Sequence, residues 1–460
     1  MADKYDVLVI GSGPGGHGAA IQAAKLGKRV AIIERRAAIG GTSVNVGTIP
    51  SKTLREAVLY LTGFRQRHIY GISYKVKEDI TFQDLMLRCD QVVRNEIGVL
   101  RNQFSRNHVT LLRGRASFLA PHLLSIESRS GTLEVEADFI FIATGSVPAR
   151  SEKVPINGRS IIDIDGVHHM ASIPDTLVVV GAGAVGIEYA SIFATLGIEV
   201  TLVDMRRQIL EFLDTEVRQA LLYHMREQGV IFRLGEEVLR VSSDGRQVTA
   251  YTKSNKRLTG EVLLYAIGRN GATQGLGLDR IGLQPNARGR LQVNEHYQTA
   301  IPHIYAVGDV VGFPALASTS MAQGRIAARH ALGVDDEATT PLLPYGLYTI
   351  PEISMVGQTE EELTQAGTPY EVGLARYRET ARGQIIGDRS GTLKLLVHSE
   401  TRKLLGVHII GQGAAELVHI GQLAMALGGT LDFLVNNVFN YPTLAECYRI
   451  AALDAFNKLA

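Results

Sequence analysis

Short apolar runs separated by glycine-rich turns dominate the first part of the chain. Residues 6–10 (DVLVI) and 29–34 (RVAIIE) are the kind of continuous apolar run that predicts a buried parallel strand. Between them stand GSGPGG and an alanine-rich stretch through Leu26, which predict a tight turn followed by a helix. The order of strand, turn, helix and strand predicts a βαβ unit.

The same pattern returns at residues 175–204, where TLVVV, GAGAVG, an apolar helix and EVTLVD follow one another. Gly11 and Glu34 are 23 positions apart, and so are Gly181 and Asp204. One GxGxxG motif is a weak signal, but two copies, each between strand and helix and each closed by an acid, are specific for dinucleotide binding. We therefore expect two dinucleotide-binding folds in one chain.

Each fold needs glycines for the turn, for contact with a pyrophosphate at the helix N-terminus and for close helix packing, and an acid for a ribose diol. The candidate residues are Gly11, Gly13, Gly16 and Glu34 in the first copy, and Gly181, Gly183, Gly186 and Asp204 in the second. Strand-to-turn segments elsewhere add Thr144, Gly145, Gly268, Gly308 and Asp309, the last being well placed to present a carboxylate to a ribityl hydroxyl.

The amino-acid composition limits the kinds of molecule that the protein is expected to bind. The 460 residues include 47 Lys and Arg against 46 Asp and Glu, so there is no basic field for nucleic acid or an anionic membrane. Only two cysteines are present, without a CxxC, and the adjacent His168 and His169 fit a polar loop better than a metal site. We expect small-molecule partners, no metal, no membrane span and a cytoplasmic location.

The whole chain resembles the flavoprotein disulfide reductases, through GGTSVNVGTIPSK (40–52), ATGSVP (143–148), IYAVGD (304–309) and the two fingerprints. The resemblance implies an α/β protein with two Rossmann-like domains, for FAD and NAD(P), and a C-terminal α+β domain that forms a homodimer or a higher homo-oligomer. It predicts the ranges 1–150 and 273–340 for FAD, 151–272 for NAD(P) and 341–460 for the interface. The further residues it assigns to the cofactor are Gly41, Thr42, Ser43, Thr48 and Lys52.

Two signatures of that family are altered. Its redox cysteines fall at Ser43 and Thr48, and its histidine base falls at Tyr441, although Glu446 is kept. Hydroxyls have pKa values too high to replace thiolates, so disulfide reduction is not expected. The resemblance implies that Lys52 and Glu188 form an ion pair beside the flavin. It also implies that Tyr441 and Glu446 approach the flavin of the other subunit.

Within the family, the chain resembles the soluble pyridine nucleotide transhydrogenases in GTIPSK, TIPEIS (349–354) and NYPT (440–443). That resemblance implies ping-pong hydride transfer between NAD(H) and NADP(H). An NAD(P)H oxidase or diaphorase, passing electrons to quinone or oxygen, stays open because loss of the disulfide also exposes flavin. A non-catalytic scaffold is disfavoured, because it would need neither the phosphate turns nor Lys52.

The second fingerprint leaves the nucleotide preference open. Asp204 suits the free 2′-hydroxyl of NAD, whereas Arg206 and Arg207 stand within reach of the 2′-phosphate of NADP. The arginines fit a solvated turn equally well. We expect strong use of NAD(H) and weaker use of NADP(H).

Overall fold

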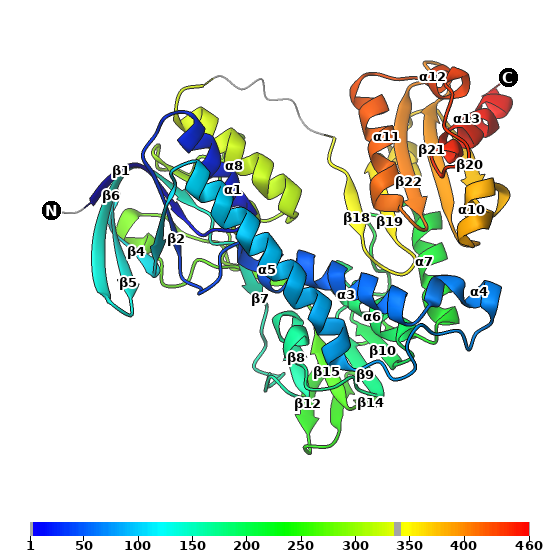
Figure 1. Cartoon of the computed structure of the whole chain (residues 1–460), viewed down its shortest axis with the longest axis horizontal. Helices are drawn as coiled ribbons and strands as arrows, with labels where there is room; N and C mark the ends of the chain where they lie inside the picture. The colour runs from blue at the N-terminus through cyan, green and yellow to red at the C-terminus, as the bar shows by residue number, and fades with distance from the viewer. Residues whose placement is uncertain (1–2, 335–341, 460) are drawn as a thin grey trace. The chain divides into compact units, whose positions relative to one another are not determined.

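The protein is described by a computed structural model over residues 3–334 and 342–459, which form two compact units. Each unit is assembled from three stretches of chain (Figure 1). Unit 1 contains Met1–Thr53, Met86–Arg150 and Gly268–Thr339, and unit 2 contains Leu54–Leu85, Ser151–Ile267 and Thr340–Ala460.

Unit 1 is built on a seven-stranded sheet whose central strands are parallel. Strand β1 pairs with β2 on one side and β6 on the other, and β17 pairs with β6. The carboxyl ends of these strands therefore meet at one edge of the sheet, where ligands of such folds bind. The strands are β1 (Asp3–Ile10), β2 (Val30–Glu34), β3 (Thr110–Arg113), β4 (Arg115–Ala120), β5 (Leu123–Ser128), β6 (Gly131–Ile142) and β17 (Ile304–Ala306).

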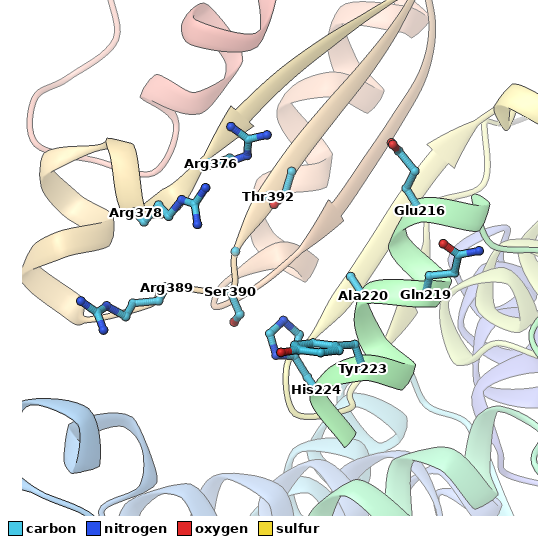
Figure 2. A pocket seen from close by; sticks show the side chains of 11 residues that line it. Glu216, Gln219, Ala220, Tyr223, His224, Arg376, Arg378, Arg389, Ser390 and Thr392 are labelled. Carbon is cyan, nitrogen blue, oxygen red and sulfur yellow. The ribbon is translucent and has the colours of Figure 1, made fainter. Parts of the chain in front are cut away.

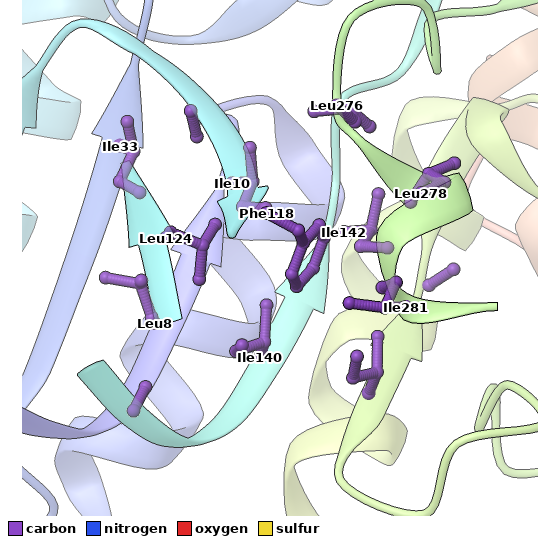
Figure 3. Packing of buried hydrophobic residues seen from close by; sticks show 14 of the residues in the cluster. Leu8, Ile10, Ile33, Phe118, Leu124, Ile140, Ile142, Leu276, Leu278 and Ile281 are labelled. Atoms are coloured by element: carbon purple, nitrogen blue, oxygen red, sulfur yellow. The ribbon is translucent and has the colours of Figure 1, made fainter. Parts of the chain in front are cut away.

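Alternate side chains along the strands of unit 1 point to opposite faces of the sheet and pack into two separate hydrophobic cores. Leu8 and Ile10 point to one face and join the cluster of Figure 3, while Val7 and Val9 join a second cluster on the other face. Both faces are buried, which is why DVLVI reads as a continuous apolar run instead of an alternating one. The first cluster is completed by Phe118 and by residues 276–283.

Helices α1 (Pro14–Lys25) and α8 (Ala317–Ala331) pack side by side in unit 1 (Figure 1). A Cβ atom at Gly324 would lie 2.1 Å from the Gly15 carbonyl oxygen, so glycine is required for this approach. The other helices that begin in or cross into unit 1 are α2 (Gly41–Asn45), α3 (Thr48–Leu61) and α5 (Phe82–Arg106).

Unit 2 contains a second parallel sheet, in the order β11-β10-β9-β15-β8. Helix α6 (Ala184–Thr195) follows β9, and α7 (Thr215–Glu227) follows β10. The strands are β8 (Ile161–Asp163), β9 (Thr176–Val180), β10 (Glu199–Asp204), β11 (Ile231–Leu234) and β15 (Val262–Tyr265), with an antiparallel β12 (Val238–Ser243), β13 (Val248–Thr252) and β14 (Arg257–Gly260) beside them.

The C-terminal part of unit 2 is an antiparallel sheet with helices packed on it. Its strands run in the order β18-β19-β22-β21-β20, and none of the turns that follow them has the complete GxGxxG pattern. The elements are β18 (Tyr345–Leu347), β19 (Ile353–Gly357), α9 (Glu360–Ala366), β20 (Tyr370–Arg376), α10 (Ala381–Ile386), β21 (Thr392–His398), β22 (Leu404–Ile410), α11 (Ala414–Ala426), α12 (Leu431–Asn436) and α13 (Glu446–Leu459).

These sheets confirm the predicted α/β class, with two Rossmann-like folds and a C-terminal α+β domain. The four predicted domain ranges stay predictions, since unit 2 contains both the second fold and the C-terminal sheet. His168 and His169 lie in a 3₁₀ helix, Ile164–His169, and not in a strand. The remaining α-helix is α4 (Arg67–Tyr70), and the remaining strands are the pair β7 (Ser146–Pro148) and β16 (Arg269–Gly271).

Candidate functional site

The first glycine-rich turn has the geometry of a phosphate cradle. Gly11 has φ 108°, and a Cβ there would lie 2.3 Å from the Ala143 carbonyl oxygen. A Cβ at Gly16 would lie 1.9 Å from the carbonyl oxygen of Gly11, so this position is fixed by helix packing. Gly13 differs, because the nearest atom to its Cβ would be 3.8 Å away. Space is thus left at the N-terminus of α1, where the helix dipole favours an anion.

Glu34 stands at the end of β2 and is buried, with its carboxylate held by the turn. Its Oε2 accepts from the Ser12 hydroxyl (2.5 Å) and the Ser12 amide (3.2 Å), and its Oε1 accepts from the Arg36 amide (2.9 Å). The Ser12 hydroxyl also accepts from the Gly40 amide at 3.0 Å. Ser12 therefore joins the acid to the GGTSVNVGTIPSK segment, a link that sequence reasoning missed.

The GGTSVNVGTIPSK segment folds into α2 and the start of α3. Gly41 has φ 61°, and its Cβ would lie 2.7 Å from the Gly13 Cα, so the segment lies directly against the first turn. Ser43 is half-buried in α2, next to Thr42, and Thr48 is the first residue of α3. The two positions at which the disulfide reductases have their redox cysteines therefore lie in helices of unit 1, and both carry hydroxyl groups.

Two further candidates, Gly308 and Asp309, lie at the carboxyl edge of the same sheet. The Ser146 hydroxyl donates to Asp309 Oδ2 at 2.6 Å and accepts from Arg269 Nε at 2.8 Å. Gly308, with φ 80°, donates its amide to the Gln323 side chain at 2.8 Å. Ser146, Arg269 and Gln323 were not predicted, because the contacts join positions up to 163 residues apart.

The Thr144 hydroxyl is buried and has no hydrogen-bond partner in the described part of the chain. A buried hydroxyl without a partner is costly, and a bound polar ligand is one way to satisfy it. With the open turn at Gly13 and the carboxylates of Glu34 and Asp309, the residues present fit an FAD molecule. Gly145 (φ 71°) and Gly268 (φ 123°) provide the turns beside Thr144 and Arg269.

The second glycine-rich turn has nearly the same geometry as the first at its first and third glycines. Gly181 has φ 106° and its Cβ would lie 2.5 Å from the Ala266 carbonyl oxygen, while a Cβ at Gly186 would lie 1.9 Å from the Gly181 carbonyl oxygen. No protein atom lies within 4 Å of a Cβ at Gly183. The α6 N-terminus is accordingly open to a pyrophosphate, and the residues fit a nicotinamide dinucleotide.

Asp204 is buried at the end of β10, and Arg206 folds back onto it. Arg206 Nε lies 2.9 Å from Oδ1 and Nη2 lies 2.8 Å from Oδ2, and the Ala182 amide donates to Oδ2 at 2.7 Å. Burial alone would raise the pKa of Asp204, but these hydrogen bonds outweigh it and the pKa lies below its ordinary value. Arg207 instead packs its side chain 3.2 Å from a Cβ position at Gly235.

Glu188 lies buried in α6, where almost every residue is buried. Its Oε1 accepts from the Tyr348 amide at 2.9 Å, and the Ile350 amide donates to the Ser191 hydroxyl at 3.2 Å. The stretch that leads into β19 is therefore hydrogen-bonded to α6. Lys52 lies in α3 of unit 1 and Glu188 in unit 2, and their ion pair stays a prediction.

The sequence pattern described as pyridine nucleotide-disulphide oxidoreductase matches residues 5–324, and the pattern of that family's dimerisation domain matches residues 343–452. The chain belongs to the pyridine nucleotide-disulphide oxidoreductase family. It is an oxidoreductase, and this membership confirms the predictions of FAD as cofactor and of nicotinamide nucleotides as substrates.

Relatives of full length support the membership. The chain is 53% identical over 458 residues to the soluble pyridine nucleotide transhydrogenase of Mycobacterium tuberculosis, covering 99% of this chain and 98% of the relative. It is 44% identical to the protein of the same name from Colwellia psychrerythraea, with coverage of 99% and 98%. The flavoprotein disulfide reductase RclA of Escherichia coli has a similar structure, with a TM-score of 0.89, 28% identity and 100% coverage of both chains.

A second solved structure, LpdA of Mycobacterium tuberculosis, superposes with a TM-score of 0.90 at 26% identity, over 98% of this chain and 99% of that one. In residues 3–334 and 342–459, no helix is both long enough and apolar enough to cross a membrane.

The two cysteines of this family member are free and buried. Burial, helped by Asp90, raises the pKa of Cys89 to about 12, and burial together with Glu446 raises the pKa of Cys447 to about 12. A thiol with such a pKa is a poor nucleophile. Neither cysteine has the environment of a redox thiol.

The two predicted residues of the dimerisation domain have contrasting environments. Tyr441 is 67% exposed, whereas one carboxylate oxygen of Glu446, the first residue of α13, is buried without a hydrogen-bond partner in the described chain. Their predicted approach to the flavin of a second subunit stays a prediction.

One acidic group, Asp214, Glu216 and Glu360, has the spacing of a metal site among the described residues. The Lys394 ammonium contacts all three carboxylates, at 3.0 Å from Asp214 and 2.8 Å from Glu216. Burial alone would lower the pKa of Lys394, but the carboxylates outweigh it and the pKa is raised. A protonated lysine already supplies the cation there.

Proposed function

We propose that the enzyme transfers hydride between NAD(H) and NADP(H) in a ping-pong cycle that uses FAD and no redox disulfide. The observation that carries the proposal is the combination of two phosphate turns of the same geometry with hydroxyl groups at positions 43 and 48. The names of the relatives, soluble pyridine nucleotide transhydrogenase, support the same conclusion.

The chain's own residues bind and orient the two nucleotides. The open helix N-termini at Gly13 and Gly183 receive pyrophosphates, and the carboxylates of Glu34 and Asp204 accept hydrogen bonds from ribose hydroxyls. FAD, when bound, supplies a two-electron carrier that one nicotinamide reduces and another reoxidises. Lys52 would provide positive charge that favours the reduced state of the cofactor, and its predicted ion pair with Glu188 is part of this proposal.

The hydroxyl groups of Ser43 and Thr48 close the route that a disulfide reductase uses. A disulfide exchange needs a thiolate, and a hydroxyl is not ionised at neutral pH. Electrons that enter from one nicotinamide therefore leave through the nicotinamide side of the enzyme. Disulfide substrates are excluded by the same chemistry.

Recognition of the 2′-phosphate rests on Arg206. In the structure its guanidinium is paired with Asp204, but its side chain is 53% exposed and can rotate toward a phosphate. Strong use of NAD(H) and weaker use of NADP(H) follow, because the carboxylate competes with the 2′-phosphate for the same guanidinium.

We also infer that the enzyme works as a homodimer in the cytoplasm. Residues 343–452 match the dimerisation domain of the family, which supports a homo-oligomer. A homodimer would allow Tyr441 and Glu446 to approach the cofactor of the partner. Sedimentation across a range of protein concentrations tests the dimer.

Steady-state kinetics test the proposed cycle. The FAD-loaded enzyme is assayed anaerobically with NADPH and thio-NAD⁺ at several fixed concentrations of each. A ping-pong cycle gives parallel double-reciprocal lines, and iodoacetamide treatment of the native enzyme leaves the rate unchanged. Intersecting lines, or a rate lost on alkylation, contradict a disulfide-free ping-pong cycle.

A further inference from the structure

A cavity outside both dinucleotide turns lies within unit 2, between α7 and the ends of β20 and β21 (Figure 2). Its volume is about 500 Å³, which is enough for a small organic ligand. One wall is the face of α7 that carries Glu216, Tyr223 and His224. The other wall is formed by the strand ends and by the loop that carries Ser390.

Arginine dominates the second wall. Arg376 ends β20, Arg378 follows it in a short 3₁₀ helix, and Arg389 precedes β21. Glu379 is shared between two of them, at 3.3 Å from Arg376 and 3.9 Å from Arg378. One carboxylate cannot satisfy the donors of two guanidinium groups, so both retain N–H groups for another anion.

Arg389 adds a third guanidinium, which makes no ion pair with any residue of the described chain. Figure 2 shows it extending away from α7, and its side chain is exposed at the edge of the cavity. The lining contains one acid, Glu216, whose carboxylate lies 2.8 Å from the Lys394 ammonium and shares it with Asp214 and Glu360, against three arginines. The lining therefore has an excess of positive charge.

The loop beneath the arginines is preorganised. Asp388 Oδ1 accepts from the amides of Ser390 (3.0 Å) and Gly391 (2.9 Å), and Oδ2 accepts from the Gln412 amide at 2.7 Å. Figure 2 shows the Tyr223 and His224 side chains directed from α7 toward this loop. Both rings contact Glu227, through the Tyr223 hydroxyl at 2.7 Å and His224 Nδ1 at 3.6 Å, so the opposite wall is also held in place.

We propose that this cavity is a binding site for a small ligand with two or more phosphate oxyanions, separate from the nucleotide sites. Guanidinium groups bind phosphate through paired N–H donors, and a rigid loop lowers the entropy lost on binding. Arg376 and Arg378 share a single carboxylate, so part of their positive charge and some of their N–H donors stay unpaired. A divalent anion can pair with both. The aromatic wall of α7 accommodates the organic part of the ligand.

Binding to the FAD-loaded enzyme, with saturating NAD⁺ to fill the second turn, tests the proposal by calorimetry at constant ionic strength. The probes are inorganic pyrophosphate, ADP and a hexose bisphosphate, which separate free pyrophosphate, nucleotide and sugar phosphate sources. The proposal predicts that at least one probe binds with a Kd in the range of about 1 mM or tighter. Absence of binding by all three overturns it.

Arg378→Gln is the deciding variant, and Arg382→Gln is its matched control, since Arg382 is an exposed arginine of α10 that does not line the cavity. We expect the Kd of the bound probe to rise about tenfold in Arg378→Gln and less than twofold in the control. Arg389→Gln gives a second, independent variant. Equal effects of Arg378→Gln and Arg382→Gln would show only a diffuse charge effect and would overturn the site.

Transhydrogenation without added anion distinguishes this proposal from the proposed function. Arg378 and Arg382 lie outside both dinucleotide turns, so both variants should keep the wild-type rate. A wild-type enzyme that fails to transhydrogenate but binds the probe through Arg378 leaves the site intact and removes only the proposed function.

Discussion

The carboxylate of Asp204 has its donors within the protein before any nucleotide binds. Four hydrogen bonds, three from Arg206 and one from the Ala182 amide, reach its two oxygens. A ribose diol must share this carboxylate, and a 2′-phosphate must draw Arg206 away from it. The pair therefore sets the balance between NAD(H) and NADP(H) in the proposed function.

Asp204→Asn tests this balance. Without the charge, Arg206 is released toward the 2′-phosphate, and the KM for NADPH should fall severalfold. The KM for NADH should rise about tenfold, which corresponds to a charge-assisted hydrogen bond of roughly 1.4 kcal/mol. Glu199→Gln removes a negative charge from the exposed start of β10 and should change neither constant.

The double variant Asp204→Asn with Arg206→Gln should lose the gain for NADPH. If Asp204→Asn leaves both KM values unchanged, the carboxylate does not contact the ribose. The pKa of Asp204 is lowered, so the carboxylate stays ionised from neutral pH down through its ordinary pKa, and the ratio of the KM for NADH of Asp204→Asn to that of the wild type should be constant from pH 6 to 8.

The buried cysteines give a second prediction about single residues. Because burial raises the pKa of both Cys89 and Cys447 to about 12, the thiolate fraction at pH 8 is negligible in the folded enzyme. A thiol reagent at pH 8 should modify neither residue in the native protein and both after denaturation. Rapid reaction of one native thiol would contradict the environments described here.

Among the elements, the helix N-termini of α1 and α6 have the same construction. In each, the first and third glycines of the fingerprint are required by close contacts with backbone. The second glycine has no such clash: a Cβ at Gly13 would lie 3.8 Å from the Gly41 Cα, and a Cβ at Gly183 meets no atom within 4 Å. The sequence repeat thus corresponds to a structural repeat, with separate roles for packing and for ligand binding.

Gly183→Ala and Gly186→Ala separate these roles. A methyl group at Gly183 meets no protein atom within 4 Å, so we expect an unchanged melting temperature and an increase of about tenfold or more in the KM for NADH. A methyl group at Gly186 would lie 1.9 Å from the Gly181 carbonyl oxygen and should lower the melting temperature as well. Equal melting temperatures and equal KM values for the two variants would refute this assignment.

Elements with a strong local signal were predictable from the sequence. The βαβ repeats, their glycines and the acids Glu34 and Asp204 follow from spacing alone. Contacts between distant segments were not, because nothing local specifies a partner: Tyr348 lies 160 residues from Glu188. The pairing of the Arg206 side chain with Asp204 could not be predicted either, because the sequence is equally compatible with a solvated arginine.

For the molecule as a whole, the Lys394 cluster joins α7 of the second dinucleotide fold to the C-terminal sheet within unit 2. The lysine and Asp214 are almost fully buried, with side chains only 2% and 1% exposed. Removing one partner of a buried ion pair leaves an uncompensated charge. The cluster therefore stabilises the unit that contains the NAD(P) fold and the dimerisation domain.

Lys394→Met should destabilise the enzyme by about 3 kcal/mol or more, because it leaves the Asp214 charge buried. Thermal unfolding of the FAD-loaded enzyme should show a melting temperature lower by roughly 6 °C. Lys403→Met, at an exposed position, is the matched control and should leave the melting temperature unchanged. Similar melting temperatures for both variants would show that the cluster contributes little.

The most direct test of a disulfide-free transhydrogenase is the rate at which each acceptor reoxidises the reduced enzyme. The FAD-loaded enzyme is reduced anaerobically with one equivalent of NADPH and mixed in a stopped-flow instrument with thio-NAD⁺, a quinone or air-saturated buffer. Flavin absorbance should return fastest with thio-NAD⁺. Faster reoxidation by quinone or oxygen than by any nicotinamide would contradict the account and identify an oxidase or diaphorase.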